Sequence, residues 1–204
     1  MSRATRKRPN ETFDVDPARR RLLLAGGLTL GATMLGDWSW MRPAAAGDTA
    51  AHATPRVRIV VFDDHGRRVG ERLVPKVVKT PAQWRRQLSA MAYYVTRESG
   101  TERAFSGNYE KPAQPGFYRC ICCGNALFDA ATQFHSGTGW PSFWQVIAPE
   151  NVTAHIDHSF GMTRTAIACT RCDAHLGHLF HDGPQPTGLR YCINSVALHF
   201  IATA

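Results

Sequence analysis

The 204-residue chain has no low-complexity tract, no internal repeat beyond its paired cysteine motifs, and no long apolar run. Its longest apolar run is the 14 residues Leu22–Leu35, whereas a permanent membrane helix needs about 20. With 44% hydrophobic and 20% charged residues, the chain is not a disordered, collagen-like or coiled-coil protein. These values are typical of one globular domain with some additional chain.

The sequence has little basic clustering outside its N-terminus: after Arg21, no run of Lys or Arg is longer than two residues. The formal net charge is +8, but residues 1–46 hold eight basic and four acidic residues. The remainder therefore carries 16 basic and 12 acidic residues, a surplus of only four. Because nucleic-acid-binding modules usually present a clustered basic surface, we expect no nucleic-acid partner.

Residues 1–46 have the three-part layout of an export signal: a polar basic start, the apolar run, and the small residues Ala44–Ala46 as a cleavage site. Arg19–Arg21 directly precede the apolar run and resemble a bacterial twin-arginine (Tat) signal, although Ala18 stands where Ser or Thr is usual. A Sec signal, an uncleaved anchor, or cleavage after Ala51–Ala53 are the alternatives. We expect an exported, periplasmic protein with no permanent membrane span after cleavage.

Residues 47–79 are predicted to be an N-terminal extension with a possible hairpin. Val57–Phe62 is a β-rich run, residues 63–66 are a turn signal, and Arg68–Lys79 could be a second strand that Pro75 interrupts. The role of this extension is left open.

A helix is predicted to begin at Thr80, with Pro81 at its first position and Gln83 at its third. Gly100 is predicted to end it. Four apolar residues follow the start at helical spacing and indicate one core-facing side: Trp84, Leu88, Met91 and Val95.

From Phe117 onward, short alternating segments lie between turns that contain Gly and Pro. Val152–Asp157 alternates clearly and Met162–Ala168 less cleanly, and Val196–Ile201 is predicted to be a terminal strand. We therefore expect residues 80–204 to form one mainly β, antiparallel domain with one or two N-terminal helices packed on it.

Four of the six cysteines form two C-x-x-C pairs, Cys120/Cys123 and Cys169/Cys172, separated by 45 residues. A C-x-x-C at the tip of a hairpin points both thiols into one space, and two such pairs can form the tetrahedral site of a structural Zn²⁺. The sequence therefore predicts one structural zinc per chain that links two distant hairpins. Two disulfides are an alternative outside the cytoplasm. A thioredoxin-like dithiol is another, although neither pair has the strand-to-helix context of that motif.

Cys192 is the candidate nucleophile. If its surroundings form a strand, the period of two places Arg190, Cys192 and Asn194 on one face. The guanidinium group is then expected to favour the thiolate. His175 and His178 follow the second cysteine pair and are predicted to act in acid–base chemistry or substrate binding.

Residues 136–144 form a loop of small residues that carries Trp140 and other aromatics. One interpretation is an aromatic wall for an apolar group such as a thioether methyl, because sulfur packs well on aromatic rings. The other is an ordinary turn that packs its aromatics into the core.

Together these motifs resemble the methionine-R-sulfoxide reductase family (MsrB, or SelR domain) over Thr80–Ile201. The motifs that carry the resemblance are Cys120-x-x-Cys123, Ser136-Gly-Thr-Gly-Trp-Pro-Ser-Phe143, Cys169-x-x-Cys172, His175-Leu-Gly-His178, Asp182-Gly-Pro184 and Arg190-Tyr-Cys-Ile-Asn-Ser195. The resemblance implies two small antiparallel sheets and a zinc held by the two cysteine pairs. It implies further active-site or pocket positions at Trp140, His175, His178, Phe180, Asp182, Arg190 and Asn194.

The implied reaction is reduction of methionine-R-sulfoxide in proteins, with free methionine sulfoxide left open. The Cys192 thiolate attacks the sulfoxide sulfur, and His178, assisted by His175, supplies a proton to the oxygen. The methyl group lies against Trp140. Cys192 is left as a sulfenic acid.

One position departs from the family pattern, because Thr138 stands where many members have a resolving cysteine. We therefore expect an external thiol reductant, thioredoxin-like or other, with Cys122 as a less favoured internal alternative. There are two alternative functions: a non-catalytic, zinc-stabilised binding domain, which does not need Cys192, and a zinc ribbon on nucleic acid, which the charge disfavours.

Overall fold

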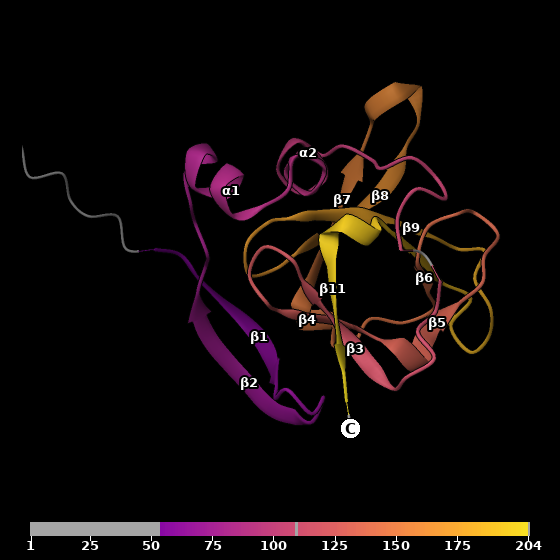
Figure 1. Ribbon diagram of the computed structural model, residues 1–204, viewed down its shortest axis with the longest axis horizontal. Coiled ribbons are helices and arrows are strands. Elements are labelled where there is room, and N and C mark those ends of the chain that lie inside the picture. The colour runs from indigo at the N-terminus through magenta and orange to yellow at the C-terminus, as the bar shows by residue number, and fades with distance from the viewer. Residues whose placement is uncertain (1–53, 109, 204) are drawn as a thin grey trace, which may run out of the picture. The chain divides into compact units, whose positions relative to one another are not determined.

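The computed structural model describes residues 54–108 and 110–203, so the predicted signal at 1–46 lies outside the described residues. The described chain is mainly β (Figure 1). Its strands are β1 Arg56–Phe62, β2 Arg68–Pro75, β3 Gly116–Cys120, β4 Ala126–Asp129, β5 Gln133–Phe134, β6 Ser142–Phe143, β7 Val152–Asp157, β8 Arg164–Cys169, β9 His175–Phe180, β10 Arg190–Ile193 and β11 Leu198–Ala202. Its helices are α1 Pro81–Gln87 and α2 Ala90–Glu98, with 3₁₀ turns η2 Ala130–Thr132, η3 Pro149–Asn151, η4 Ser159–Gly161 and η5 Ser195–Ala197.

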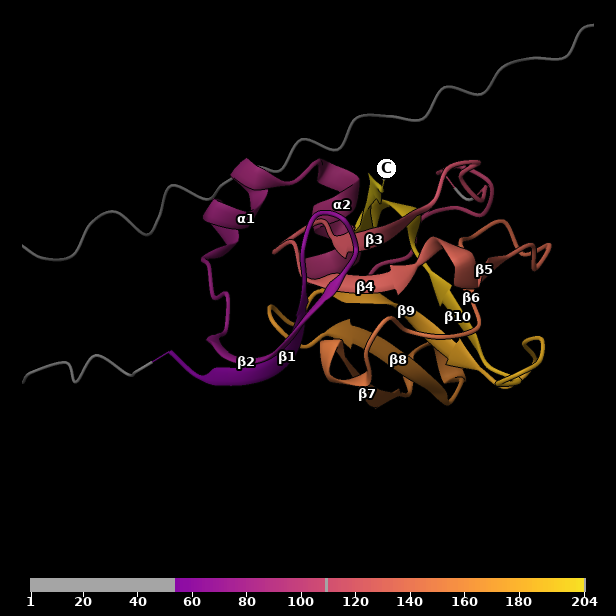
Figure 2. The same cartoon turned by 90° about the horizontal axis from the view of Figure 1, so that it is seen from below.

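The strands pair antiparallel in three sheets. β1 and β2 form a hairpin, β11-β3-β4 form a three-stranded sheet, and β5-β6-β10-β9-β8-β7 form a six-stranded sheet. Figure 2 shows the three-stranded sheet lying over the six-stranded one. The mainly β, antiparallel class is confirmed. The two antiparallel sheets that the resemblance implied both lie within residues 80–204, and the predicted hairpin before them forms a third.

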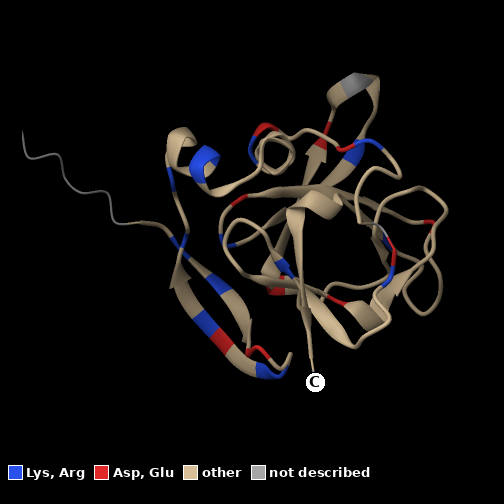
Figure 3. Ribbon diagram, in the orientation of Figure 1, with Lys and Arg blue, Asp and Glu red and all other residues tan. Residues whose placement is uncertain are grey.

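The possible hairpin within residues 47–79 is present and consists of β1 and β2. β2 ends at Pro75, which has no N–H to donate to a neighbouring strand. Asn151 attaches β1 to the sheets: its Oδ1 accepts from the Val60 N–H at 2.7 Å, and its Nδ2 donates to the Val60 and Ala126 carbonyls. Most residues of β2 are exposed, and this strand carries charges of both signs (Figure 3).

The predicted helix start at Thr80 is confirmed, since Thr80 and Gln83 form a reciprocal capping box. The prediction of one helix with a single apolar face up to Val95 was wrong. The chain becomes extended at Leu88, and the Ser89 side chain caps a second helix. The break changes the helical phase, and Met91 is 46% exposed. Helix α2 ends with Ser99 in the left-handed region, one residue before the predicted Gly100. Among the described residues, no helix has the length and apolarity to cross a membrane.

The core between the two larger sheets positions β10. Phe128 and Phe143 stack at 4.3 Å between ring centroids, and the Tyr118 ring meets Phe143 edge-on at 5.2 Å. β9 lies very close to β10 at Gly177, where an added Cβ would be 2.0 Å from the Cys192 carbonyl oxygen. Glycine is therefore required beside Cys192.

Candidate functional site

Both cysteine pairs lie at hairpin tips, as predicted. Cys120 ends β3 and Cys169 ends β8, and each is followed by a turn into the next strand. The two turns have the same construction: Gly124 (φ 74°) and Asp173 (φ 56°) both adopt left-handed backbone, and their N–H groups donate to the carbonyls of Cys120 and Cys169 at 2.9 Å. Neither pair begins a helix, so the thioredoxin-like context is absent from both.

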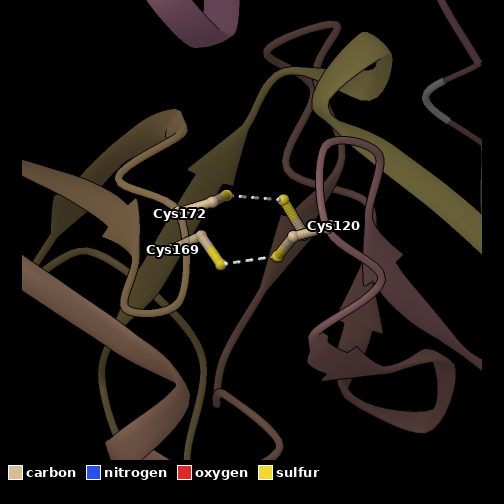
Figure 4. Close-up of side chains that lie close together, drawn as sticks. Cys120, Cys169 and Cys172 are labelled. Atoms are coloured by element: carbon tan, nitrogen blue, oxygen red, sulfur yellow. Dashed lines mark hydrogen bonds between the residues drawn. The ribbon is translucent and has the colours of Figure 1, made fainter. Parts of the chain in front are cut away.

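The four sulfur atoms of Cys120, Cys123, Cys169 and Cys172 all lie within 4.8 Å of one another. Two Sγ–Sγ distances across the hairpins are 3.7 Å (Cys120–Cys172) and 3.6 Å (Cys123–Cys169) (Figure 4). A tetrahedral Zn²⁺ with 2.3 Å bonds separates its sulfur ligands by about 3.8 Å. A disulfide requires about 2.05 Å, and all six cysteines, which the structure describes, are free. The four thiols therefore fit a tetrahedral metal ion.

A metal ion held there would join two sheets, because one cysteine pair belongs to the three-stranded sheet and the other to the six-stranded sheet. The helices support both hairpin tips. Gln87 of α1 donates to the Cys122 carbonyl at 2.7 Å, and Arg97 of α2 donates to the Cys172 carbonyl at 2.8 Å. Asn125 donates to Cys169 Sγ at 3.6 Å, the kind of bond that stabilises a thiolate ligand.

The structure does not bring Cys122 and Cys192 together. The buried Cys122 thiol contacts Cys120, Cys172 and the Thr96 side chain of α2. Cys192 instead contacts side chains of the small-residue loop and Arg190.

Cys192 lies in a row of residues that crosses the six-stranded sheet. Ser142 of β6 pairs with Cys192 of β10, Cys192 with His178 of β9, and His178 with Ala166 of β8. Directly paired residues of antiparallel strands point to the same face, with Cβ atoms about 4.5–5.5 Å apart. The pairing therefore places the thiol and the imidazole beside each other.

A cavity of about 110 Å³ opens onto this face. Its lining residues are Thr101, Trp140, Arg164, Gly177, His178, Phe180, Cys192 and Asn194. The structure thus brings together five of the site residues predicted from sequence: Trp140, His178, Phe180, Cys192 and Asn194. β10 ends at Ile193, so Asn194 reaches the cavity from the residue after the strand.

Three predicted site residues do not line the cavity. Arg190 makes a bidentate ion pair with Asp182, with both distances 2.8 Å, and its guanidinium lies 4.3 Å from the Phe180 ring centroid. Asp182 therefore orients Arg190, which in turn contacts Cys192. His175 is buried beside His178, with 5.3 Å between ring centroids.

Comparison with known proteins matches the part of the chain that contains the four-cysteine centre and the Cys192 cavity. Residues 88–202 match the SelR domain family. The chain belongs to this family. Similar proteins named peptide methionine sulfoxide reductase MsrB include those of Herminiimonas arsenicoxydans (51% identity, 64% of this chain, 96% of the relative), Hahella chejuensis (53%, 61% and 90%) and Pseudomonas putida (55%, 60% and 94%). The resemblance seen in the sequence motifs is confirmed, and the β1–β2 hairpin precedes the matched region.

The charge state of Cys192 in this SelR domain differs from the sequence expectation. Burial raises the pKa of the Cys192 thiol above its ordinary value of 9.0, against the opposing effects of Thr138 and Arg190. Arg190 does favour the thiolate, as the sequence indicated, but the opposing effect of burial is larger. Cys192 is therefore a thiol at neutral pH.

Both histidines are neutral at pH 7. Burial is the largest cause that lowers the pKa of His175, to about 4, and it also lowers the pKa of His178. His178 Nε2 lies 2.9 Å from Asp157 Oδ2, and Arg164 donates to the same oxygen at 2.7 Å. Hydrogen bonds to Ser159 and His178 hold the pKa of Asp157 well below its usual range. Because this carboxylate accepts, Nε2 carries the His178 proton and Nδ1 can take another.

Sequence reasoning missed Asp157, Arg164 and Glu102. Asp157 and Arg164 pair across the β7–β8 hairpin. The alternation of residues 152–157 in the sequence could have indicated Asp157 as a polar residue of that strand. Glu102 is buried, and its carboxylate accepts from the Ser195 N–H and hydroxyl and from the Val196 N–H. No local pattern in the sequence marks Glu102 as a buried acid.

Proposed function

We propose that the protein reduces the R epimer of methionine sulfoxide in polypeptides to methionine, leaving Cys192 as a sulfenic acid that an external thiol reduces. The observation that carries the proposal is the cross-strand pair of Cys192 and His178 at a cavity walled by Trp140. Membership of the SelR family, and the name that its relatives bear, support this activity over a non-catalytic binding domain.

The proposed first step moves one proton and one oxygen atom. His178 Nδ1 takes the proton from the Cys192 thiol, and the thiolate sulfur attacks the sulfoxide sulfur. His178 returns the proton to the sulfoxide oxygen, and the oxygen passes to Cys192 as the substrate S–O bond breaks. A thiol and a sulfoxide thus become a sulfenic acid and a thioether, with two electrons transferred from Cys192 to the substrate sulfur.

The sulfenic acid then needs two electrons from outside the site. Two external thiols, or one dithiol protein of the thioredoxin type, would return Cys192 to the thiol and release water and a disulfide. Thr138, whose Oγ1 lies 3.9 Å from Cys192 Sγ, cannot form a disulfide. Trp140 and Phe180 supply aromatic surface for the substrate methyl group and sulfur. Selectivity for the R epimer rests on the family resemblance.

We propose Zn²⁺ as the resident ion of the four-cysteine centre, with a structural role. A closed four-thiolate shell leaves no position for substrate, and such a zinc contributes about 10–16 kcal/mol of apparent binding free energy. The donor set and the sulfur–sulfur distances support this assignment. Metal analysis of the purified protein should give one zinc per chain, and a metal-free folded protein would remove the proposal.

We also propose export to the periplasm through the twin-arginine route, with residues 1–46 removed. The support is the sequence layout around Arg19–Arg21. Replacing Arg19 and Arg20 by lysine should leave the protein in the cytoplasm, whereas the wild type should be recovered from the periplasm with a shortened N-terminus. Equal export of both proteins would exclude this route.

The activity is tested with separated R and S epimers of a methionine-sulfoxide peptide and dithiothreitol as reductant. We expect reduction of the R epimer alone. Reduction of neither epimer by folded, metal-containing protein would contradict the proposed function, and equal reduction of both would contradict the stereochemical assignment.

A further inference from the structure

A second, smaller cavity adjoins the Cys192 cavity, and Trp140 lines both. It measures about 50 Å³. Three aromatic residues line it, Phe105, Phe134 and Trp140. The other lining residues, all from the segment between Phe134 and Trp140, are His135, Ser136, Gly137 and Gly139. Space of this size holds about three to five water-sized groups, which corresponds to a small aliphatic side chain.

Phe105 lines this cavity and has a backbone conformation that is rare for residues other than glycine. Its φ is 61°, a left-handed conformation that is strained for a bulky residue, yet the residue is 59% exposed. The Phe105 N–H donates to the Gly139 carbonyl at 2.9 Å. Gly139 has no side chain to displace the ring, since an added Cβ would lie 2.6 Å from Phe105 Cδ2. The surrounding structure therefore maintains a strained conformation that presents an aromatic ring beside the cavity.

The loop that carries Phe105 is fixed to the residues that directly follow β10. Besides its carboxylate bonds to Ser195 and Val196, Glu102 donates its N–H to Asn194 Oδ1 at 2.9 Å. The Trp140 indole N–H donates to the Glu102 carbonyl at 3.1 Å. These contacts hold the walls of both cavities in one arrangement, so the second cavity is preformed beside the first.

We infer that the second cavity binds an apolar side chain of a residue next to the methionine sulfoxide in a polypeptide substrate, with Phe105 as the specificity-determining residue. The inference rests on the proposed function. Consecutive residues of a peptide lie about 3.8 Å apart, and Trp140 lines both cavities, so neighbouring side chains can occupy them together. Aromatic walls favour aliphatic groups, because burying apolar surface is the main source of binding free energy there.

The test compares two peptides that contain R-methionine sulfoxide flanked by Leu or by Gly on both sides. For the wild type, kcat/KM should be at least about fivefold higher for the Leu peptide. Phe105→Asn should reduce that ratio to about one, because Asn tolerates the left-handed backbone but removes the ring. Val69→Asn removes an exposed apolar residue of the distant hairpin (51% exposed) and should leave the ratio at the wild-type value.

Binding measurements separate this inference from the proposed function. The same two peptides with reduced methionine are titrated into Cys192→Ser and into Cys192→Ser/Phe105→Asn by calorimetry. A Leu preference that Phe105→Asn removes supports the cavity assignment even if the wild type turns over neither peptide. Equal affinities for the two peptides, or a preference that survives Phe105→Asn in a protein with unchanged thermal stability, would overturn it.

Discussion

Cys120, Cys123, Cys169 and Cys172 lie at hairpin tips and face one another, whereas Cys192 lies within a strand and faces a cavity. The first four have sulfur atoms and amide N–H groups as neighbours. The fifth has a hydroxyl, a guanidinium and an imidazole. One residue type thus serves two purposes, and the neighbours decide which.

The two regions also differ in whether a substrate can reach their sulfur atoms. Four thiolates at the corners of a tetrahedron complete the coordination of a metal ion, so substrate has no access. The single partly buried thiol of Cys192 keeps one side free toward a cavity of about 110 Å³. Changes at the first region should therefore affect stability, and changes at the second should affect turnover. The predictions below test this division.

The largest expected effect is that of Cys169→Ser. Removing one ligand of a closed site should release the metal and separate the two sheets that it joins, because the ion's contribution is comparable with the whole stability of a domain. We expect less than about 10% of the wild-type zinc content and no cooperative thermal transition. A Cys169→Ser protein that melts as the wild type does would refute the structural role of the centre.

Cys192→Ser should have the opposite profile. Turnover of the R-epimer peptide should fall by at least about 10³-fold, because none of the other five cysteines, all of which the structure describes, lines the cavity. Zinc content and melting temperature should stay close to the wild-type values. Retained activity would show that another thiol is the nucleophile.

A smaller loss of activity is expected for Asp157→Asn. The amide can donate to His178 Nε2, which would place the imidazole proton on Nδ1, the atom that we propose takes the proton from Cys192. We expect kcat to fall by about 10²-fold, with less effect on KM. Glu71→Gln, which removes a carboxylate from the exposed hairpin, is the matched control and should be as active as the wild type. Equal losses in the two variants would contradict a positioning role for Asp157.

The pH dependence of thiol reactivity tests the charge state of Cys192. Because burial raises the pKa of this thiol, the thiolate fraction should increase only as pH rises past 9.0, and iodoacetamide labelling should have a midpoint above that value. Arg190→Gln should move the midpoint higher still, since the guanidinium opposes the effect of burial. Mass spectrometry of the Cys192 peptide gives the rate. A midpoint near neutral pH would restore the thiolate that the sequence suggested.

The smallest change in rate is expected for Thr138→Cys, which introduces a second thiol beside the nucleophile. The Thr138 hydroxyl is already 3.9 Å from Cys192 Sγ, so a short movement brings two sulfur atoms to the about 2.05 Å of a disulfide. We expect the introduced thiol to form a disulfide with Cys192 after one turnover without reductant, detected by peptide mapping. Absence of that disulfide, with Cys192 oxidised, would show that the loop is held too rigidly to close.

The sequence predicted the metal centre well because its signal is local: two residues separate each pair of cysteines, and a strand precedes each pair. It also placed Arg190 and Cys192 on one face, since strand periodicity is local too. It failed where distant partners decide the outcome. The pKa of Cys192 depends on how the folded domain buries its thiol, and the orientation of His178 depends on Asp157 from another hairpin.

The helical region shows a different kind of failure. The spacing from Trp84 to Val95 fits one helix, but the Ser89 side chain offers a local cap that begins a new helix instead. A capping side chain competes directly with continuation of the helix, and hydrophobic periodicity alone does not weigh that competition. Met91 was consequently assigned to the wrong side.

A single turnover in the absence of reductant tests the division between the two cysteine regions most directly. The protein is mixed with one equivalent of the R-epimer peptide, trapped with a sulfenic-acid reagent such as dimedone, and mapped by mass spectrometry alongside a zinc measurement. We predict one adduct per chain at Cys192, with Cys120, Cys123, Cys169 and Cys172 unmodified and the zinc retained. An adduct at any of those four residues, or zinc released in proportion to methionine formed, would contradict the account.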